Sequence, residues 1–323
     1  MARMPRIKRI DEDGWYHLCA RVAGRSGWFP FEDPLARMKL LMLIKKYLEV
    51  FFCEAAGFCL MGNHYHLISK FEAFRTLSRE ELYQRALKLY KNPNAVLVSD
   101  RQWERFNRRL FDISEFMRSL QSEYAKWYNR TYDRKGAFWG DRFKSVLLGE
   151  NQSIMDAVFY VELNPVRAKL VERPEDWSWS SAYLREIGDD GWLTPLSELI
   201  PAAAEYDVES NYKYRLYYRG GIQTKAGTGF IPAKIVASEA EKGFRRPGAF
   251  SQKIKYFTEG LVLGSEIQIR DWITRMRREM YYLRRRHPIS HHLDGAIHYT
   301  LREQRCIQKP NDSPVNHCSM ARG

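Results

Sequence analysis

Two histidines separated by one residue are the first feature of the chain that points to chemistry. They lie in the run Gly62-Asn63-His64-Tyr65-His66-Leu67, whose Gly-Asn pair is a signal for a hairpin turn before a strand. Alternate side chains of a strand share a face, so His64 and His66 are expected on one face with about 7 Å between their Cα atoms. Two imidazoles at that spacing can hold one metal ion. The alternative is a pair of half-buried histidines without a metal. The sequence contains no His-Glu-x-x-His motif and no cysteine cluster near the pair, so nothing further favours a zinc hydrolase.

A tyrosine and an asparagine four residues apart form the second candidate. Tyr160 and Asn164 lie in a segment expected to be helical, where residues four apart share a face. A phenol in this position can face a bound phosphate while the Asn164 oxygen faces the same metal. The alternative is a core tyrosine and an asparagine that caps the helix before Pro165.

The hydrophobic pattern predicts a scaffold for these residues. Apolar alternation and helical periodicity indicate strands at 14–23, 54–61, 64–70 and 142–148, and helices at 34–52, 113–129 and 153–164. The order strand, helix, two hairpin strands, helix, strand is the ferredoxin-like arrangement. The sequence therefore predicts an α+β fold, an antiparallel sheet with helices on one face.

Two segments fall outside this pattern. Residues 71–111 are charged and irregular, and we expect a partly helical insertion in a first domain that spans residues 1–190. Residues 191–323 form a basic, mostly helical C-terminal extension in which 266–286 indicate a very basic helix and the end, from about residue 302, is expected to be poorly ordered.

Charge and composition restrict the class of partner. The chain has 323 residues with 52 Lys and Arg against 39 Asp and Glu, a net charge of +13, which favours nucleic acid. The sequence has no run of about 18 uncharged apolar residues, so no membrane span is predicted. The basic N-terminus lacks the apolar core of a signal peptide. Five cysteines without a Cys-x-x-Cys motif fit a reducing cytoplasm.

Five motifs in a fixed order give the chain a family resemblance. The hydrophobic-Gly-Asn-His-x-His-Leu strand is followed by a helix with Tyr-x-x-Trp-Tyr-Asn at 124–129, by Gly-Ala-Phe-Trp-Gly-Asp-Arg-Phe-Lys-Ser at 136–145, by Tyr-x-x-x-Asn-Pro-Val-Arg-Ala at 160–168 and by Trp-Ser-Trp-Ser-Ser at 177–181. Over residues 10–185 this series resembles the IS200-like (Y1) tyrosine transposases, and most of all the REP-associated tyrosine transposases of the HUH nuclease superfamily.

The resemblance implies a function and a site. It implies a single-stranded DNA endonuclease and strand transferase, a transposase in which Tyr160 attacks a phosphodiester and forms a 5′-phosphotyrosine with a free 3′-OH. His64 and His66 match the metal ligands of the family, and Asn164 matches the position of a third ligand. The implied cofactor is Mg²⁺ or Mn²⁺, with stronger binding of Mn²⁺ expected because Mg²⁺ prefers oxygen ligands and Mn²⁺ accepts imidazole. The implied partner is single-stranded or hairpin DNA in a cytoplasmic, nucleoid-associated setting, and relatives occur both as homodimers and as monomers.

Basic residues on either side of the last strand and of the Tyr160 helix are the expected DNA surface. They would neutralise phosphates and make affinity salt-dependent: Arg130, Arg134, Lys135, Arg142, Lys144, Arg167 and Lys169. Phe138, Trp139, Trp177 and Trp179 either stack on unpaired bases or pack in the core.

Two other functions stay open at this point. One is a domesticated, catalytically idle DNA-binding protein on the same fold, and the other is a metal-dependent hydrolase that uses the histidines without Tyr160. The presence of all four of His64, His66, Tyr160 and Asn164 favours the enzyme, because a DNA-binding protein has no need of the full set.

Overall fold

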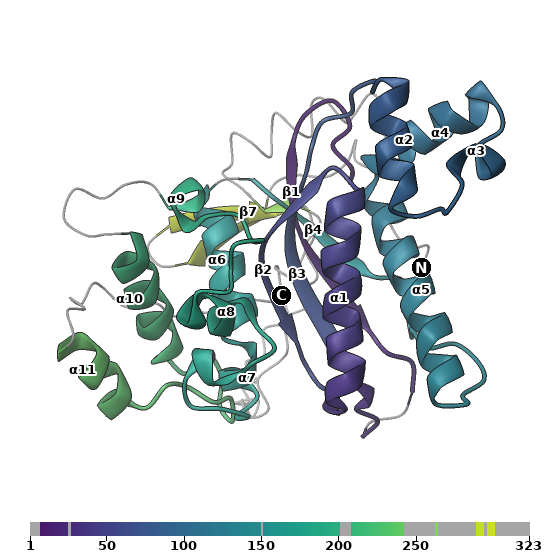
Figure 1. Ribbon diagram of the computed structural model, residues 1–323. Helices are drawn as coiled ribbons and strands as arrows, with labels where there is room; N and C mark the ends of the chain where they lie inside the picture. The colour runs from purple at the N-terminus through teal and green to yellow at the C-terminus, as the bar shows by residue number, and fades with distance from the viewer. Residues whose placement is uncertain are drawn as a thin grey trace, which may run out of the picture.

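The sheet at the centre of the molecule is built from strands that are distant in the sequence. The structure, a computed structural model, describes residues 7–24, 27–149, 151–200, 208–241, 262–263, 289–293 and 296–300. Among these residues the largest sheet has the strand order β2-β3-β1-β4-β5 (Figure 1). Its strands are β1 (Gly14–Arg21), β2 (Cys53–Leu60), β3 (His64–Phe71), β4 (Lys144–Leu148) and β5 (Val262–Leu263). The strands β1 to β4 pair antiparallel and β5 pairs parallel with β4, so the predicted α+β fold with an antiparallel sheet is confirmed.

Two long helices cover one face of the sheet. These are α1 (Pro34–Val50) and α5 (Ile113–Thr131), which lie side by side (Figure 1). Asp33 caps α1 by accepting a hydrogen bond from Leu35 N at 2.8 Å, and Pro34 occupies the first helical position. The apolar residues that give α5 its helical periodicity form a buried stripe, which includes Phe116, Met117, Leu120, Tyr124 and Tyr128. The two helices and the sheet share one hydrophobic core.

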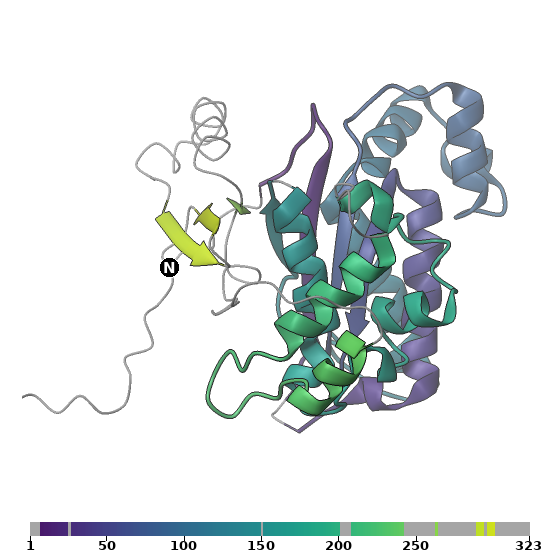
Figure 2. The same ribbon diagram turned by 90° about the vertical axis from the view of Figure 1, so that its left-hand side faces the viewer.

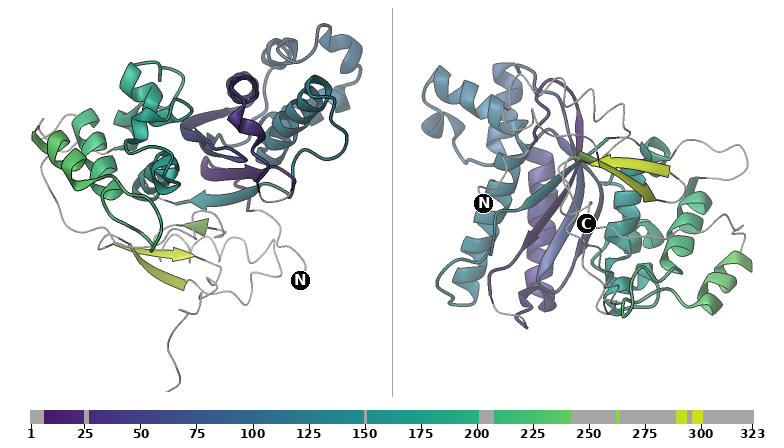
Figure 3. Two further views of the ribbon diagram at one scale, coloured as in Figure 1. Left: turned by 90° about the horizontal axis from the view of Figure 1, so that it is seen from below. Right: turned by 180° about the vertical axis from the view of Figure 1, so that it is seen from behind.

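A second layer of helices covers the other face, so the prediction of helices on one face only is wrong. The helix α6 (Asn151–Glu162) packs on β2 and β3, opposite α1 and α5 (Figure 3). The physical reason lies in the strands, because β3 buries Leu67 in the first core and Ile68 in a second core with Val158. Strands that are apolar on both faces need a layer on each side.

The second layer continues beyond α6 with short helices. They are α7 (Asn164–Arg167), α8 (Ser181–Ile187), α9 (Leu196–Leu199), α10 (Val208–Gly220) and α11 (Ala233–Glu241), joined by the 3₁₀ turn η2 (Pro174–Asp176). Figure 2 shows α10 running across the outside of this layer. Tyr212 and Leu216 of α10 belong to the same core as Phe159 of α6. The domain division near residue 190 stays a prediction.

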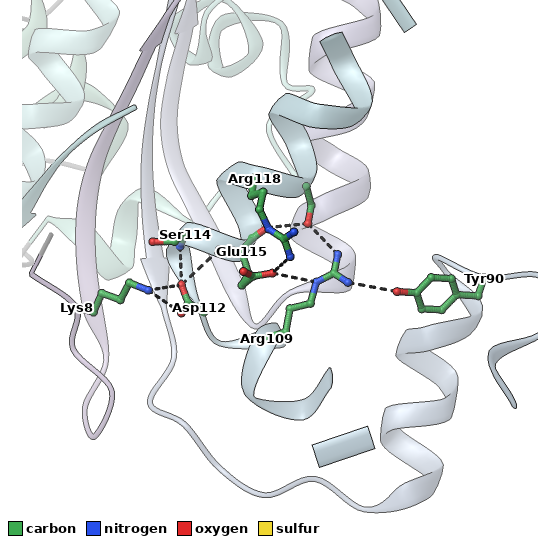
Figure 4. Close-up of polar contacts among 8 residues, drawn as sticks. Lys8, Tyr90, Arg109, Asp112, Ser114, Glu115 and Arg118 are labelled. Atoms are coloured by element: carbon green, nitrogen blue, oxygen red, sulfur yellow. Dashed lines mark hydrogen bonds and ion pairs between the residues drawn. The ribbon is translucent and has the colours of Figure 1, made fainter. Parts of the chain in front are cut away.

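The segment after β3, predicted as a partly helical insertion, contains three helices. It forms α2 (Arg79–Leu87), α3 (Pro93–Val96) and α4 (Asp100–Leu110), and Ser78 and Ser99 each begin a helix with a complete capping box. Arg109 of α4 holds the insertion against α5, since it donates to Ser119 Oγ at 2.9 Å and pairs with Glu115. Within the insertion it also donates to Tyr90 Oη at 3.2 Å, and Figure 4 shows these contacts around Arg109.

The remaining elements include a 3₁₀ turn η1 (Pro30–Glu32) before α1, and two strands, β6 (Ile289–Leu293) and β7 (Ala296–Thr300), which pair antiparallel. The predicted basic helix at 266–286 and the chain end from residue 302 lie outside the described residues. In the part of the chain that the structure describes, no helix combines the length and apolar character that a membrane crossing needs.

Candidate active site

The pairing of three strands assembles a cluster of imidazoles on the face covered by α6. Opposite residues of neighbouring antiparallel strands point to the same face. His66 of β3 lies opposite Cys19 of β1 and opposite Cys59 of β2. His64 and His17, two residues before His66 and two before Cys19, therefore share this face with His66. His64 and His66 were predicted from their spacing, whereas His17 lies in no motif that indicates a site.

His64 and His66 lie close together, as their spacing predicted. Their ring centroids are 5.1 Å apart and the rings are nearly perpendicular, at 87°. The Nδ1 of His64 lies 2.9 Å from Oδ1 of Asn63, and because a carbonyl oxygen accepts, His64 donates from Nδ1. In a neutral ring the lone pair is then on Nε2. The Nδ1 of His66 is also engaged, at 2.9 Å from Nε2 of His17.

The surroundings keep both histidines neutral. Burial, with a smaller contribution from the positive charge of Arg21, lowers the pKa of His64 to about 4. Burial lowers the pKa of His66 well below its ordinary value, and His17 and His64 add to the effect. Neutral imidazole is the form that binds a metal, so no proton has to be displaced at neutral pH.

Tyr160 lies over the imidazole cluster from the C-terminal end of α6. Its ring meets His66 edge-on at a centroid distance of 5.8 Å and 83°, and meets His17 at 5.7 Å and 73°. The side chain is half-buried. Burial raises the pKa of the Tyr160 phenol, and Cys19 and Cys59 add to the shift. The phenol is therefore protonated at neutral pH and has to lose its proton in order to act as a nucleophile.

Asn164 is held at the end of α6 by its amide nitrogen. Its Nδ2 donates to the backbone oxygens of Tyr160 at 2.8 Å and of Val161 at 3.3 Å. The helix-capping role and the role near a metal are therefore compatible, since the first uses Nδ2 and the second would use Oδ1. Sequence reasoning had treated them as alternatives.

The neighbouring thiols are poor candidates for ligands. Burial raises the pKa of Cys19 to about 11 and that of Cys59 further, so both are protonated at neutral pH. Over the described ranges, no group of three or more His, Cys, Asp or Glu side chains is arranged to hold a metal ion. Oδ1 of Asn164 is a carboxamide oxygen, a type of atom that binds divalent cations in proteins. Two neutral imidazoles and one carbonyl oxygen suit Mn²⁺ and are less suited to Mg²⁺.

The predicted DNA surface divides into exposed residues and residues used inside the protein. Arg130, Lys135, Arg142, Lys144 and Lys169 are exposed. Arg134 is half-buried, donates to Ala137 O at 2.9 Å and stacks on Trp28 at 4.6 Å, so it holds the loop after α5. Lys144 lies opposite Cys19, next to the imidazole cluster. Arg21, which the sequence analysis missed, is exposed and lies opposite His64.

Arg167 has a structural role. Its guanidinium donates to four backbone carbonyls. Two are at the end of α10, Arg219 at 2.7 Å and Gly220 at 3.4 Å, and two are in the segment after it, Ile222 at 2.5 Å and Gly229 at 3.2 Å. Burial lowers the pKa of Arg167 to about 10. Its donors are engaged within the fold, which leaves the exposed lysines and arginines as the better candidates for phosphate contacts.

The four aromatic side chains considered for base stacking are packed against the protein. Phe138 is buried, and Trp139 Nε1 donates to Gln121 O at 2.8 Å. Trp177 Nε1 donates to Leu60 O at 3.0 Å, and the Arg37 guanidinium lies over both Trp177 and Trp179. In this structure the packing alternative describes them.

Comparisons with known proteins give a distant likeness to a solved structure. No family model matches the chain, and no curated protein matches it. One solved structure is described as a REP-associated tyrosine transposase bound to a REP hairpin. It is similar over 64% of this chain and 94% of its own, with 16% sequence identity and a TM-score of 0.38.

Proposed function

We propose that this chain is a metal-dependent endonuclease and strand transferase that acts on single-stranded DNA with Tyr160 as its nucleophile. The observation that carries the proposal is the position of Tyr160. Its ring centroid lies 5.8 Å from that of His66, and the ring centroid of His66 lies 5.1 Å from that of His64. A nucleophile of suitable type thus lies beside two neutral imidazoles that are able to bind a metal. The motif series that includes His64, His66, Tyr160 and Asn164 supports the same function.

The proposed reaction is a transesterification, in which the tyrosine replaces the 3′ oxygen of the DNA strand at one phosphorus. The Tyr160 oxygen attacks the phosphorus of a DNA phosphodiester and releases its proton to solvent. The P–O3′ bond breaks, the upstream strand leaves with a 3′-OH, and the downstream strand stays attached as a 5′-phosphotyrosine. Attack by a 3′-OH on that linkage reverses the step and restores the phenol, so the strand is rejoined without a nucleotide cofactor.

Each residue of the site has a defined task in this proposal. His64, His66 and Asn164 would hold Mn²⁺ or Mg²⁺, which when bound polarises the scissile phosphate and neutralises its charge. Tyr160 is presented by α6 against the sheet, and its half-buried position limits the geometry of attack. Arg21 and Lys144 flank the cluster on exposed positions of the same sheet and would bind phosphates on either side.

The proposal extends to substrate and setting. The substrate is single-stranded or hairpin DNA, since an unpaired strand can enter a site at the junction of a helix and a sheet more readily than a duplex. The finer fold assignment is a ferredoxin-like sheet of the Y1 transposase type, with α6 as the helix that carries the nucleophile. In the same proposal the protein is cytoplasmic and associated with the nucleoid, and it forms a homodimer.

The experiment that tests the function is a covalent capture. The full chain is incubated with Mn²⁺ and labelled single-stranded oligonucleotides that carry a hairpin with randomised flanks, and adducts are separated on a denaturing gel. The wild-type chain and Tyr83→Phe are expected to form the adduct, and Tyr160→Phe is expected to form none while it still binds DNA. Tyr83 is a matched control because it is also half-buried and lies in α2 of the insertion.

The same assay separates the alternatives. If the protein were a catalytically idle DNA-binding protein, the wild-type chain and both variants would bind the oligonucleotides, and none would form an adduct. A hydrolase that uses only the histidines would cleave DNA equally well with Tyr160→Phe. Either outcome would contradict the proposal.

A further inference from the structure

A third imidazole, which no sequence motif indicated, contacts both the histidine pair and the tyrosine. His17 lies on the central strand β1 and is only 1% exposed. Its Nε2 lies 2.9 Å from Nδ1 of His66, and the two rings are stacked at 5.1 Å and 26°. The same ring meets Tyr160 edge-on at 5.7 Å. His17 is therefore in contact with a proposed metal ligand and with the proposed nucleophile.

The contact between His17 and His66 decides which nitrogen of His66 carries a proton. A hydrogen bond between two neutral imidazoles contains one proton, so one ring donates and the other accepts. If His66 donates from Nδ1, its Nε2 has the lone pair and can bind a metal. If His17 donates, His66 carries its proton on Nε2 and that nitrogen cannot bind a metal.

His64 shows the same arrangement with an unambiguous direction. Oδ1 of Asn63 accepts from Nδ1 of His64 at 2.9 Å, which leaves the lone pair of His64 on Nε2. With the lone pair of His66 also on Nε2, each of the two rings would offer its Nε2 to a metal held between them. Groups that engage the second nitrogen of a metal-binding imidazole fix its tautomer and orientation.

We propose that His17 is a positioning residue that accepts the Nδ1 proton of His66 and holds His66 in the Nδ1–H tautomer, with Nε2 available for the metal. The inference rests on the metal site of the proposed function. In the proposal His17 does for His66 what Asn63 does for His64. His17 is not a metal ligand in this proposal, because its Nε2 is used in the bond to His66.

Two substitutions separate this role from simple packing. His17→Phe keeps an aromatic ring of similar shape and removes the acceptor. His17→Gln removes the ring and places an amide oxygen, an acceptor, near the position of Nε2. If His17 is needed only to fill space, Phe is the better replacement; if it is needed as an acceptor, Gln is.

The first measurement is the tautomer of His66 in the metal-free full chain. Nitrogen-15 NMR distinguishes Nδ1–H from Nε2–H, and the His66 signals are assigned by their absence in His66→Gln. We expect the Nδ1–H tautomer in the wild-type chain and in His17→Gln, and a mixture of tautomers in His17→Phe. A wild-type His66 that is protonated on Nε2 overturns the proposal, and this result does not depend on whether either variant folds.

The second measurement is the affinity for Mn²⁺ alone, by titration calorimetry without DNA. His17→Phe is expected to weaken binding about 10- to 100-fold, the usual effect of losing such a partner, and His17→Gln to stay within a few-fold of wild type. Equal affinity of His17→Phe and the wild-type chain overturns the proposal.

Failure of this inference is distinguishable from failure of the proposed function. The His17 measurements use no DNA, so they can succeed even if Tyr160→Phe still cleaves. A wild-type chain that binds no Mn²⁺ overturns the role of His17 together with the metal site.

Discussion

Arg219 of α10 forms an ion pair with Asp156 of α6, and both side chains are buried. Asp156 lies one helical turn before Tyr160, so the pair ties the helix that carries the proposed nucleophile to the segment beyond residue 200. The Arg219 guanidinium also lies over the ring of Phe159, 4.7 Å from its centroid. The position of Tyr160 thus depends on residues of the C-terminal segment.

Breaking this pair is expected to destabilise the protein. Arg219→Met leaves the Asp156 carboxylate buried without its cation, and removing one partner of a buried pair costs about 3–5 kcal/mol. Urea unfolding monitored by circular dichroism measures the change in the free energy of unfolding. The double change Asp156→Leu with Arg219→Met should recover much of the loss, and a single variant as stable as wild type would contradict the role of the pair.

The two histidines of the pair are expected to differ in their effect on folding. His64 is half-buried, so His64→Ala should abolish Mn²⁺-dependent adduct formation with little change in stability. His66 is 3% exposed, so His66→Ala should abolish the adduct and also destabilise the fold by about 2–5 kcal/mol, as for other large-to-small core changes. Thermal unfolding and the adduct assay on both variants check this, and full activity of either variant would remove that histidine from the site.

The division of the predicted DNA surface gives a matched pair of variants. Arg167→Met removes donors to four backbone carbonyls and should lower stability, with little change in the salt dependence of DNA binding. Lys144→Gln changes an exposed residue beside the imidazole cluster, and should reduce the salt slope of binding by about one unit at constant stability. A DNA titration at several salt concentrations measures the slope. The opposite pattern would return Arg167 to the DNA surface.

A hydrogen bond between the ends of α1 and α5 predicts an acid-dependent stability. Tyr132 Oη donates to Asp33, and this bond is the main cause that lowers the pKa of Asp33 below its ordinary value of 3.8. The pKa of Asp33 is lower in the folded than in the unfolded protein. The stabilisation that ionised Asp33 contributes is therefore present above pH 3.8 and is lost as the pH falls through the folded pKa. Tyr132→Phe should raise the pKa of Asp33 and weaken this acid dependence. Carbon-13 NMR titration of Asp33 checks the first effect, and an unchanged pKa would contradict it.

Local patterns predicted local structure well. The stripe from Phe116 to Tyr128 on α5 and the shared face of His64 and His66 follow from side-chain periodicity alone, and the structure has both. The helices of the insertion carried a usable signal in Ser78 with Glu81 and Ser99 with Gln102, which are the capping boxes that begin α2 and α4.

Features that depend on long-range pairing could not be predicted in this way. His17 reaches His66 only because β1 lies beside β3, and no spacing along the chain encodes that neighbour. Arg167 donates to backbone carbonyls that lie 52 to 62 residues later in the chain, and no local pattern around Arg167 indicates these partners. The second helical layer follows from the burial of Ile68 in a second core. The sequence shows that Ile68 is apolar, but it does not show that this side chain belongs to a separate core.

The most direct test of the central claim is the chemical identity of the residue bonded to DNA. The adduct formed with Mn²⁺ and a labelled hairpin oligonucleotide is digested with nuclease and protease, and the modified peptide is sequenced by mass spectrometry. The account predicts a 5′-phosphonucleotide on Tyr160 and on no other residue, and a free 3′-OH on the released strand. A nucleotide on a different side chain, or cleaved DNA with no modified peptide, would contradict it.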